Sequence, residues 1–235
     1  MCGIVGFVNK DKNKEEIIKK MMERINHRGP DGEGTFIDDN IALGHKRLSI
    51  IDLSTGNQPM FNENERYVII FNGEIYNYLE LKEELIKKNH YFKTTSDTEV
   101  LLHGYEEYGY NLLQRLRGMF AFVIWDREKE ELFGARDHFG IKPFYYYKND
   151  DTLMFASEIK AFLDHPKFKK ELNKEVLMPY LSFNYSPTED TFFKGVKRLE
   201  PGHFLVYKDG KLTIKRYFKL TFNEQAGAAG GLAAT

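Results

Sequence analysis

The arrangement of expected strands and helices in separate blocks restricts the fold of this chain more than any other feature. Apolar side chains recur at helical spacing in residues 79–86 and 100–105. Four segments rich in branched and aromatic residues then follow one another through short polar turns, at 119–125, 131–135, 143–147 and 152–155. We expect these four to form an antiparallel meander. Because strands and helices do not alternate regularly, the pattern favours an α+β domain of stacked layers over a doubly wound parallel sheet.

The flanking segments are consistent with such layers. Residues 4–8 are expected to form a short buried strand, and residues 14–25 an amphipathic helix. Further strands are expected at 41–51 and 67–71, and either Thr95 or Ser96 is expected to cap the helix that contains residues 100–105. Near the C-terminus, Asp209-Gly210 between two β-rich runs is a strong hairpin signal. The uncharged small residues that end the chain predict a flexible tail or linker over residues 221–235.

Composition argues against several classes of function. The chain has 235 residues, of which 42% are hydrophobic and 29% charged, a balance typical of a folded globular protein. Its formal net charge is −1, so no basic field exists to hold nucleic acid or an anionic membrane surface. The longest strongly apolar run, 119–125, is far shorter than the roughly 18 residues of a membrane-spanning helix. No secretory signal is recognisable at the N-terminus, and a cytoplasmic location is expected.

The single cysteine lies at position 2, where removal of Met1 makes it the first residue of the mature chain. One interpretation is that Cys2 is a small buried residue of an apolar strand, which is the usual role of a free cysteine. The other is that it is a nucleophile, because an N-terminal thiol is adjacent to its own α-amine, with a reference pKa of about 7.7 to 8.0. Such an amine can act as the general base for the thiol.

Other kinds of chemistry have no recognisable motif. The chain lacks the GxxxxGKS/T and GxGxxG patterns that hold phosphate groups, and the GxSxG pattern of serine hydrolases. Its seven histidines include no pair at metal-ligand spacing, and one cysteine is insufficient for a thiolate site. We therefore expect no nucleotide site and no metal site in this chain.

Six motifs, in their order and spacing, resemble the glutaminase domain of glutamine-hydrolysing asparagine synthetase, a class II amidotransferase with an N-terminal nucleophile. They are spread over nearly all of residues 2–220, and they are Cys2-Gly3-Ile4-Val5-Gly6, His27-Arg28-Gly29-Pro30-Asp31, Arg47-Leu48-Ser49-Ile50-Ile51-Asp52, Phe71-Asn72-Gly73-Glu74-Ile75-Tyr76-Asn77, Ser96-Asp97-Thr98-Glu99 and Ala156-Ser157-Glu158-Ile159-Lys160. The resemblance implies the four-layer αββα fold of N-terminal-nucleophile hydrolases, with two stacked antiparallel sheets between helical layers. It implies one glutamine amidotransferase domain over residues 2–220.

The resemblance also assigns catalytic roles. Cys2 corresponds to the nucleophile that attacks the side-chain amide of L-glutamine and forms a γ-glutamyl thioester, which water hydrolyses to glutamate. Asn72, through its side-chain amide, and Gly73, through its backbone N–H, correspond to the oxyanion hole. An Asn-Gly pair after a strand is also typical of a hairpin turn.

A pocket for free glutamine needs groups for its carboxylate and its ammonium. By resemblance, Arg47 is expected to bind the carboxylate, and Asp97 and the Glu74 region the ammonium group. The strand residues expected to line the pocket are Leu48, Ser49, Ile50 and Ile51, although the apolar ones are equally explained as core. A lone charged residue is usually a solvated surface group, so these assignments depend on the resemblance.

Full-length relatives continue into a synthetase domain that activates aspartate with ATP, and no motif of that domain occurs here. We expect the glutaminase step to need no cofactor, with ATP and Mg²⁺ confined to a synthetase domain or subunit that accepts the ammonia. Residues 139–144 are expected to face that partner or to form a Gly/Pro turn, and His138 stands where relatives often carry arginine. Two alternatives are a catalytically silent glutamine-sensing or docking module, and the glutaminase half of an amidotransferase with another acceptor.

Overall fold

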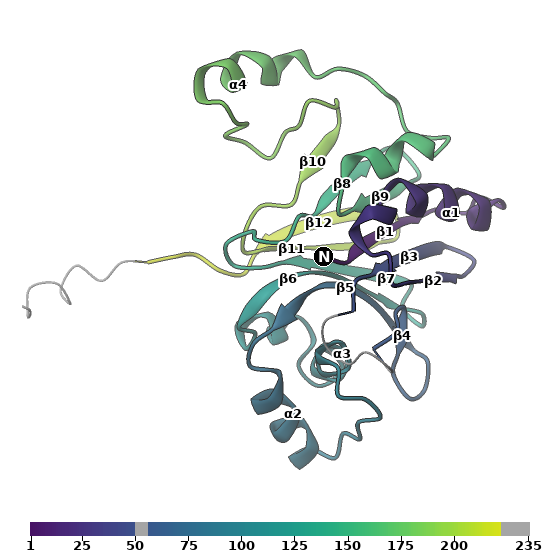
Figure 1. Ribbon diagram of the computed structural model, residues 1–235, viewed down its shortest axis with the longest axis vertical. Helices are drawn as coiled ribbons and strands as arrows, with labels where there is room; N and C mark the ends of the chain where they lie inside the picture. Colours follow the sequence, from purple (N-terminus) through teal and green to yellow (C-terminus); the bar gives the residue numbers. More distant parts are fainter. Residues whose placement is uncertain (50–55, 222–235) are drawn as a thin grey trace, which may run out of the picture.

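Two six-stranded antiparallel sheets stack face to face at the centre of the molecule, and helices cover the outer face of each sheet (Figure 1). The structure is a computed structural model that describes residues 1–49 and 56–221. Hydrophobic residues of both sheets meet in one buried layer, with Ile4 and Leu43 from the first sheet and Ile70 and Val123 from the second. The expected α+β fold with its αββα order of layers is confirmed.

The first sheet has the strand order β10-β8-β9-β1-β3-β2. Its strands are β1 (Gly3–Val8), β2 (Gly32–Ile37), β3 (Ile41–Arg47), β8 (Tyr145–Lys148), β9 (Leu153–Ala156) and β10 (Val196–Arg198). Helix α1 (Lys14–Arg24) and the 3-10 helix η3 (Ile159–Asp164) pack on its outer face, where Met21 and Phe162 are fully buried. Because β1 pairs with both β3 and β9, the residue that precedes it is held in the middle of the sheet.

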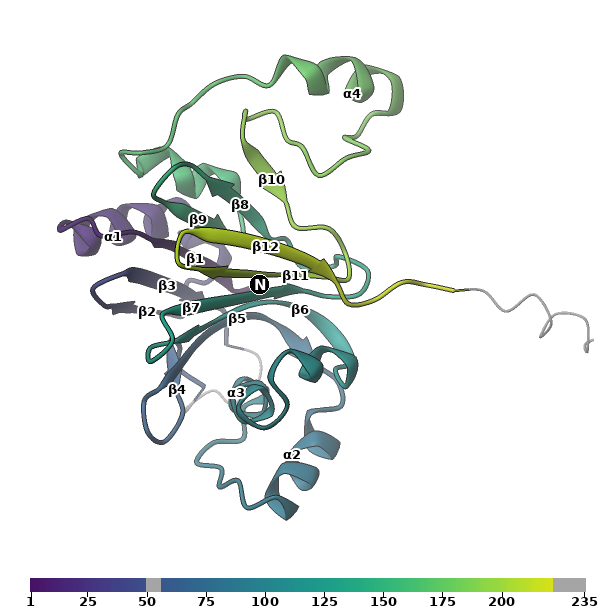
Figure 2. The same cartoon turned by 180° about the vertical axis from the view of Figure 1, so that it is seen from behind.

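The second sheet has the strand order β12-β11-β7-β6-β5-β4. Its strands are β4 (Met60–Phe61), β5 (Tyr67–Ile75), β6 (Gly118–Asp126), β7 (Glu131–Arg136), β11 (His203–Lys208) and β12 (Lys211–Arg216). Helices α2 (Tyr78–Lys87) and α3 (Asp97–Tyr108), with the 3-10 helix η2 (Gly109–Gln114), lie against its outer face, opposite the side that carries α1 (Figure 2). Of the two expected caps of α3, Ser96 is the one used, since its hydroxyl accepts a hydrogen bond from the Thr98 N–H.

The remaining short helices lie around the first sheet. The 3-10 helix η1 (Asn26–Arg28) follows α1, and η4 (Lys174–Val176) leads into α4 (Leu177–Phe183). Helix α4 stands apart at one end of the molecule in both views, and none of its residues is buried (Figures 1 and 2). No helix within the described ranges is long and apolar enough to cross a membrane.

The expected four-strand meander is wrong, because its strands belong to different sheets. Strands β6 and β7 pair in the second sheet, whereas β8 and β9 pair in the first. The chain changes sheet at Asp137, a fully buried residue whose carboxylate accepts N–H groups of Phe120, Phe139, Ile141 and Lys142. Strand patterning marks each segment but carries no information about which sheet it joins, so the crossover was not visible in the sequence.

Two strand boundaries also differ from expectation. The strand expected at 41–51 ends at Arg47, and residues 50–55 lie outside the described residues. Strand β5 continues past Phe71 to Ile75, so Asn72 and Gly73 lie within a strand, opposite Ala121 and Phe120. The interpretation of this Asn-Gly pair as a hairpin turn is therefore wrong. The hairpin at Asp209-Gly210 is present, and both residues have positive φ, 49° and 75°. The predicted tail lies almost entirely in residues 222–235, outside the described residues.

Candidate functional site

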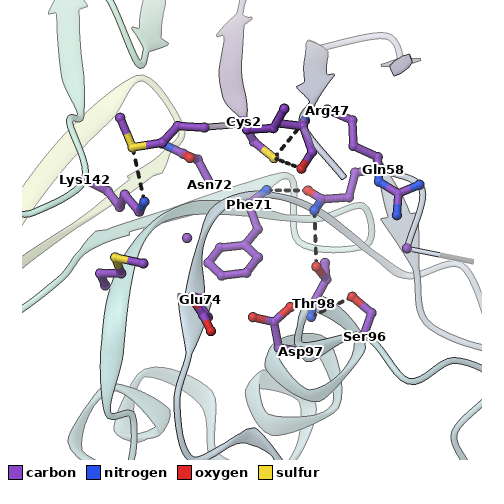
Figure 3. A pocket seen from close by; sticks show the side chains of 15 residues that line it. Cys2, Arg47, Gln58, Phe71, Asn72, Glu74, Ser96, Asp97, Thr98 and Lys142 are labelled. Carbon is purple, nitrogen blue, oxygen red and sulfur yellow. Dashed lines mark hydrogen bonds between the residues drawn. The ribbon is translucent and has the colours of Figure 1, made fainter. Parts of the chain in front are cut away.

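Cys2 lies at the mouth of a cavity between the N-terminal ends of β1 and α3 and the middle of β5 (Figure 3). Its side chain is partly exposed. The Sγ atom lies 3.4 Å from the backbone nitrogen of Leu48, which donates to it, and 3.5 Å from the Leu48 carbonyl oxygen. The thiol therefore rests against the backbone that follows β3, with the cavity on its other side.

Residues from two other sequence motifs fix the backbone at Cys2. The Arg28 guanidinium donates from Nε to the Cys2 carbonyl oxygen at 3.0 Å and from a terminal nitrogen to Glu158 at 2.9 Å. Ser157 accepts the N–H of Ile4 at 3.0 Å. Residues near 28 and near 158 thus act as supports that hold the start of β1.

Asn72 contributes a buried side-chain amide to the cavity. It is 1% exposed, and its Nδ2 atom has no hydrogen-bond partner among the residues that the structure describes. A buried amide nitrogen without a partner costs about 1 to 3 kcal/mol. Asn72 lines the same cavity as Cys2, so its position fits a donor kept for an atom of the substrate (Figure 3).

Gly73, the next residue, also lines the cavity. A Cβ atom at this position would lie 2.2 Å from the Met119 carbonyl oxygen and 2.8 Å from the Cα of Phe120. Only glycine fits between β5 and β6 here, and the absence of a side chain leaves this backbone accessible from the cavity.

Arg47, the residue expected to bind the carboxylate of glutamine, lies with its neighbours at the end of β3. Arg47 is 8% exposed, lines the cavity and donates to Oδ1 of Asn57 at 2.8 Å. Leu48 lines the cavity as expected. Ser49 is not among the lining residues that the structure describes, and its N–H donates to Asp31 at 2.8 Å. Ile50 and Ile51 lie outside the described residues.

Two carboxylates, Glu74 and Asp97, lie on the wall below Cys2 (Figure 3). Oδ2 of Asp97 accepts the N–H of Ile75 at 3.0 Å. Burial raises the pKa of Asp97 to about 6, and the nearby charge of Glu74 contributes to that rise. A cationic group placed between the two carboxylates would relieve both effects, which fits the expected ammonium subsite.

The sequence reasoning missed several lining residues, of which Gln58 and Lys142 have the clearest contacts. Gln58 accepts the Phe71 N–H at 2.6 Å and donates to the Thr98 hydroxyl at 3.2 Å, so it joins β5 to α3. Lys142 is 5% exposed, and burial lowers the pKa of its ammonium group. No motif signalled Gln58. For Lys142, the signal was a single charged residue between Ile141 and Pro143 in an otherwise apolar run.

Met1 also lines the cavity, and its Sδ atom lies 3.3 Å from the Lys142 Nζ. While Met1 is present, the nitrogen of Cys2 is part of a peptide bond and cannot act as a base. Loss of Met1 would release that nitrogen as an amine and uncover Lys142. The segment with Lys142 also has an outer side, where Phe139 and Ile141 are 67% and 56% exposed.

Known proteins are similar to this chain over nearly its whole length. A family model described as a glutamine amidotransferase domain matches residues 1–218. Glutamine-hydrolyzing asparagine synthetase 1 of Bacillus subtilis (strain 168) is 49% identical over 94% of this chain and 36% of that protein. Glutamine-hydrolyzing asparagine synthetase 3 of the same organism is 39% identical over 94% of this chain and 37% of that protein. The chain thus spans little more than a third of the length of these relatives.

Two solved structures share the fold. The glutamine phosphoribosylpyrophosphate amidotransferase of B. subtilis, in complex with ADP and GMP, has a TM-score of 0.68 at 23% identity and covers 92% of this chain and 49% of that chain. The allosteric regulatory enzyme of purine biosynthesis has a TM-score of 0.69 at 22% identity, with the same coverage. At these identities the likeness concerns the fold alone.

Proposed function

Because the chain belongs to the family of glutamine amidotransferase domains, we propose that its Cys2 cavity hydrolyses the side-chain amide of L-glutamine to glutamate and ammonia. The observation that carries this proposal is the buried Nδ2 atom of Asn72, which has no partner among the described residues and lines the same cavity as the only thiol of the chain. A donor held in this way is suited to an oxyanion that exists only during the reaction.

Glutamine binds through the two charged groups on its α-carbon, which contact different residues of the cavity wall. Arg47 holds the α-carboxylate through its guanidinium, and Asp97 with Glu74 holds the α-ammonium. The orientation follows from where the charges lie, since the cation is at the end of β3, and the two carboxylates come from β5 (Glu74) and the start of α3 (Asp97) (Figure 3). The amide carbon then lies toward Cys2, with its oxygen toward Asn72 and Gly73.

The chemistry proceeds in two halves once Met1 has been removed. The Cys2 α-amine takes the thiol proton, sulfur bonds to the amide carbon, and the carbonyl oxygen becomes an oxyanion bound by Asn72 Nδ2 and the Gly73 N–H. The C–N bond then breaks, and the proton on the amine passes to the nitrogen that leaves as ammonia. In the second half, the amine takes a proton from water, whose oxygen bonds to the thioester carbon. The C–S bond breaks, the thiolate recovers the proton, and glutamate is released.

We propose that this reaction needs no cofactor and that the ammonia passes to an ATP-dependent synthetase domain or subunit, since the relatives are named as asparagine synthetases. Mg²⁺ and ATP would act there, on a carboxylate acceptor such as aspartate. Exposed Phe139 and Ile141, next to cavity-lining Lys142, give such a partner an apolar surface beside the site. We propose a cytoplasmic location as well.

The test combines intact mass with a glutaminase assay. Protein that begins at Cys2 is incubated with glutamine after chelator treatment, without ATP, and glutamate and ammonia are measured. We expect both products in equal amounts, and no thioester or product from a matched form with an uncleaved N-terminal extension. Glutamate formation by both forms would remove the α-amine from the mechanism. Absence of glutamate from the processed form, even at high glutamine, would favour the silent binding module.

A further inference from the structure

A second group of polar side chains lies on the far half of α3, outside the Cys2 cavity. The ligand atoms of His90, His103 and Glu106 all lie within 4.8 Å of one another. His103 is 1% exposed, and the side chains of His90 and Glu106 are 13% and 31% exposed. From these contacts we propose that His90, His103 and Glu106 bind one divalent transition-metal ion of the Zn²⁺ class. We call this group the His90–His103 site.

The backbone fixes all three ligands. His103 and Glu106 are three residues apart on α3, so their side chains share one face of the helix. His90 follows the end of α2, where Asn89 has a φ of 67° and the His90 N–H donates to the Leu85 carbonyl oxygen at 3.1 Å. Helices α2 and α3 lie side by side (Figures 1 and 2). The fold therefore brings together histidines that the sequence separates by 13 positions, which is why their spacing gave no metal signal.

The distance between the two imidazoles suits a shared metal ion. The Nδ1 atoms of His90 and His103 are 3.2 Å apart, and the rings are inclined at 69°. Two nitrogens bound to Zn²⁺ at about 2.0 to 2.1 Å in a tetrahedral arrangement are separated by about 3.3 Å. Oε2 of Glu106 lies 3.8 Å from the His103 Nδ1 and needs only a small rotation of an exposed side chain to complete the third contact. Water would supply the fourth ligand.

The Nε2 atoms of both rings, which face away from each other, lie near carboxylates. Nε2 of His90 lies 3.3 Å from Glu107, and Nε2 of His103 lies 3.4 Å from Glu63 and 3.9 Å from Glu99. If each Nε2 carries its proton and donates to a carboxylate, both Nδ1 atoms present lone pairs to each other. That arrangement suits a cation between them. Metal-binding histidines commonly have this carboxylate partner on the second nitrogen.

The 3.2 Å contact also fits a hydrogen bond in which the Nδ1–H of one ring donates to the Nδ1 of the other. Such a hydrogen bond needs only the two nitrogens, whereas a metal ion also uses the carboxylate of Glu106. The presence of that third ligand atom within reach, on the same helix face, favours the metal ion. Four carboxylates surround the two rings, those of Glu63, Glu99, Glu106 and Glu107, and they make the site favourable for a doubly charged ion.

The test uses Co²⁺ as a spectroscopic substitute for Zn²⁺ on the chelator-treated full chain. We expect one bound Co²⁺ per chain with the visible absorption of a tetrahedral ion, displaced by one equivalent of Zn²⁺. His90→Ala and Glu106→Gln should each weaken binding at least tenfold, and both replace partly exposed side chains, so the fold is retained. Glu107→Gln, which removes the carboxylate partner of His90 and the ion pair with Lys88 but no metal ligand, should weaken binding by about tenfold.

Two control variants test whether Co²⁺ binds at the His90–His103 site and not through other side chains. His203 lies 3.8 Å from Glu200 three residues away, the same separation as His103 and Glu106, but the contacts of His203 include no second histidine. His203→Ala should leave Co²⁺ binding unchanged. Cys2→Ser should also retain it, because the thiol is not a ligand of this site. Three results would overturn the proposal: loss of binding in Cys2→Ser, binding by the His90 and Glu106 variants equal to that of the unchanged chain, or no Co²⁺ binding at all. The last result would mean that the two rings are joined only by a hydrogen bond.

Discussion

Polar groups that lie around the two halves of helix α3 are satisfied in opposite ways. At the N-terminal end, the cavity keeps a buried Asn72 amide without a described partner and an Asp97 carboxylate whose pKa burial raises to about 6. In the second half of the helix, the outer nitrogens of His90 and His103 face carboxylates, while the inner nitrogens face each other. In the Cys2 cavity, several chemically different groups line one space, which suits an organic substrate. In the His90–His103 site, the ligand atoms converge on one point, which suits an ion.

The largest expected effect is a loss of glutamine hydrolysis at the Cys2 cavity that leaves metal binding at the His90–His103 site unchanged. Cys2→Ala removes the nucleophile, and we expect glutamine hydrolysis to fall by about 10⁴-fold or more. The same variant should still bind glutamine and should bind Co²⁺ like the unchanged chain, because neither process uses the thiol. Product formation, equilibrium binding of glutamine and cobalt absorption measure the three properties. Residual hydrolysis close to the original rate would show that another group is the nucleophile.

The second prediction is a smaller loss of activity on replacing Asn72, whose amide nitrogen has no described hydrogen-bond partner. Asn72→Ala should lower kcat by about 10² to 10³-fold with little change in KM, because the donor acts on the oxyanion and not on bound glutamine. Stability should change little, since the amide nitrogen makes no described hydrogen bond in the folded state.

Asn77 is the matched control for Asn72. It is also buried, but its amide donates to the Arg115 carbonyl oxygen at 2.9 Å and accepts the Arg117 N–H at 2.8 Å. Asn77→Ala should therefore lower the free energy of unfolding by about 1 to 3 kcal/mol and leave kcat nearly unchanged. Urea unfolding and steady-state kinetics measure both variants. A kcat loss in Asn77→Ala equal to that in Asn72→Ala would contradict the assigned role.

Arg47 should affect binding more than chemistry. Arg47→Ala removes the cation that holds the glutamine carboxylate in the ground state and the transition state alike, so KM should rise by about 10 to 100-fold while kcat changes little. Arg47→Lys should give an intermediate KM, because an ammonium lacks the planar fork of the guanidinium. Arg115→Ala, which removes a surface ion pair with Glu84, serves as the control and should leave KM unchanged. A normal KM in Arg47→Ala would place the carboxylate elsewhere.

The sequence revealed the cavity more fully than it revealed the fold around it. Cys2, Asn72 and Arg47 stand in motifs whose order along the chain signals the family, and the structure brings all three to one cavity. Gln58, between the motifs, contributes through contacts that only tertiary packing creates. The sheet crossover at Asp137 was hidden because strand periodicity does not encode pairing partners. His90 and His103 were missed for the same reason, since their contact depends on how α2 packs against α3.

The smallest expected effect is a pH dependence of glutamine binding that comes from Asp97. Its pKa is raised above the ordinary value of 3.8 to about 6, mainly by burial. Without ligand, ionisation of Asp97 thus disfavours the folded state as pH rises from about 4 to 6. The ammonium of glutamine needs the ionised carboxylate, so affinity should increase as pH rises through about 6. Relative to pH 8, binding should be about twofold weaker at pH 6 and about tenfold weaker at pH 5.

This pH effect is best measured as glutamine binding by Cys2→Ala, since no thiol chemistry then interferes. His45, which lies behind the cavity with Nε2 3.1 Å from the Phe71 carbonyl oxygen, does not contribute in this range, because burial lowers its pKa to about 4 and it stays neutral. Asp97→Asn should bind glutamine more weakly at pH 8 and lose most of the change between pH 5 and 8. If the pH profile of Asp97→Asn matched that of its parent, the ammonium would depend on a different carboxylate, and Glu74 would be the group to replace next.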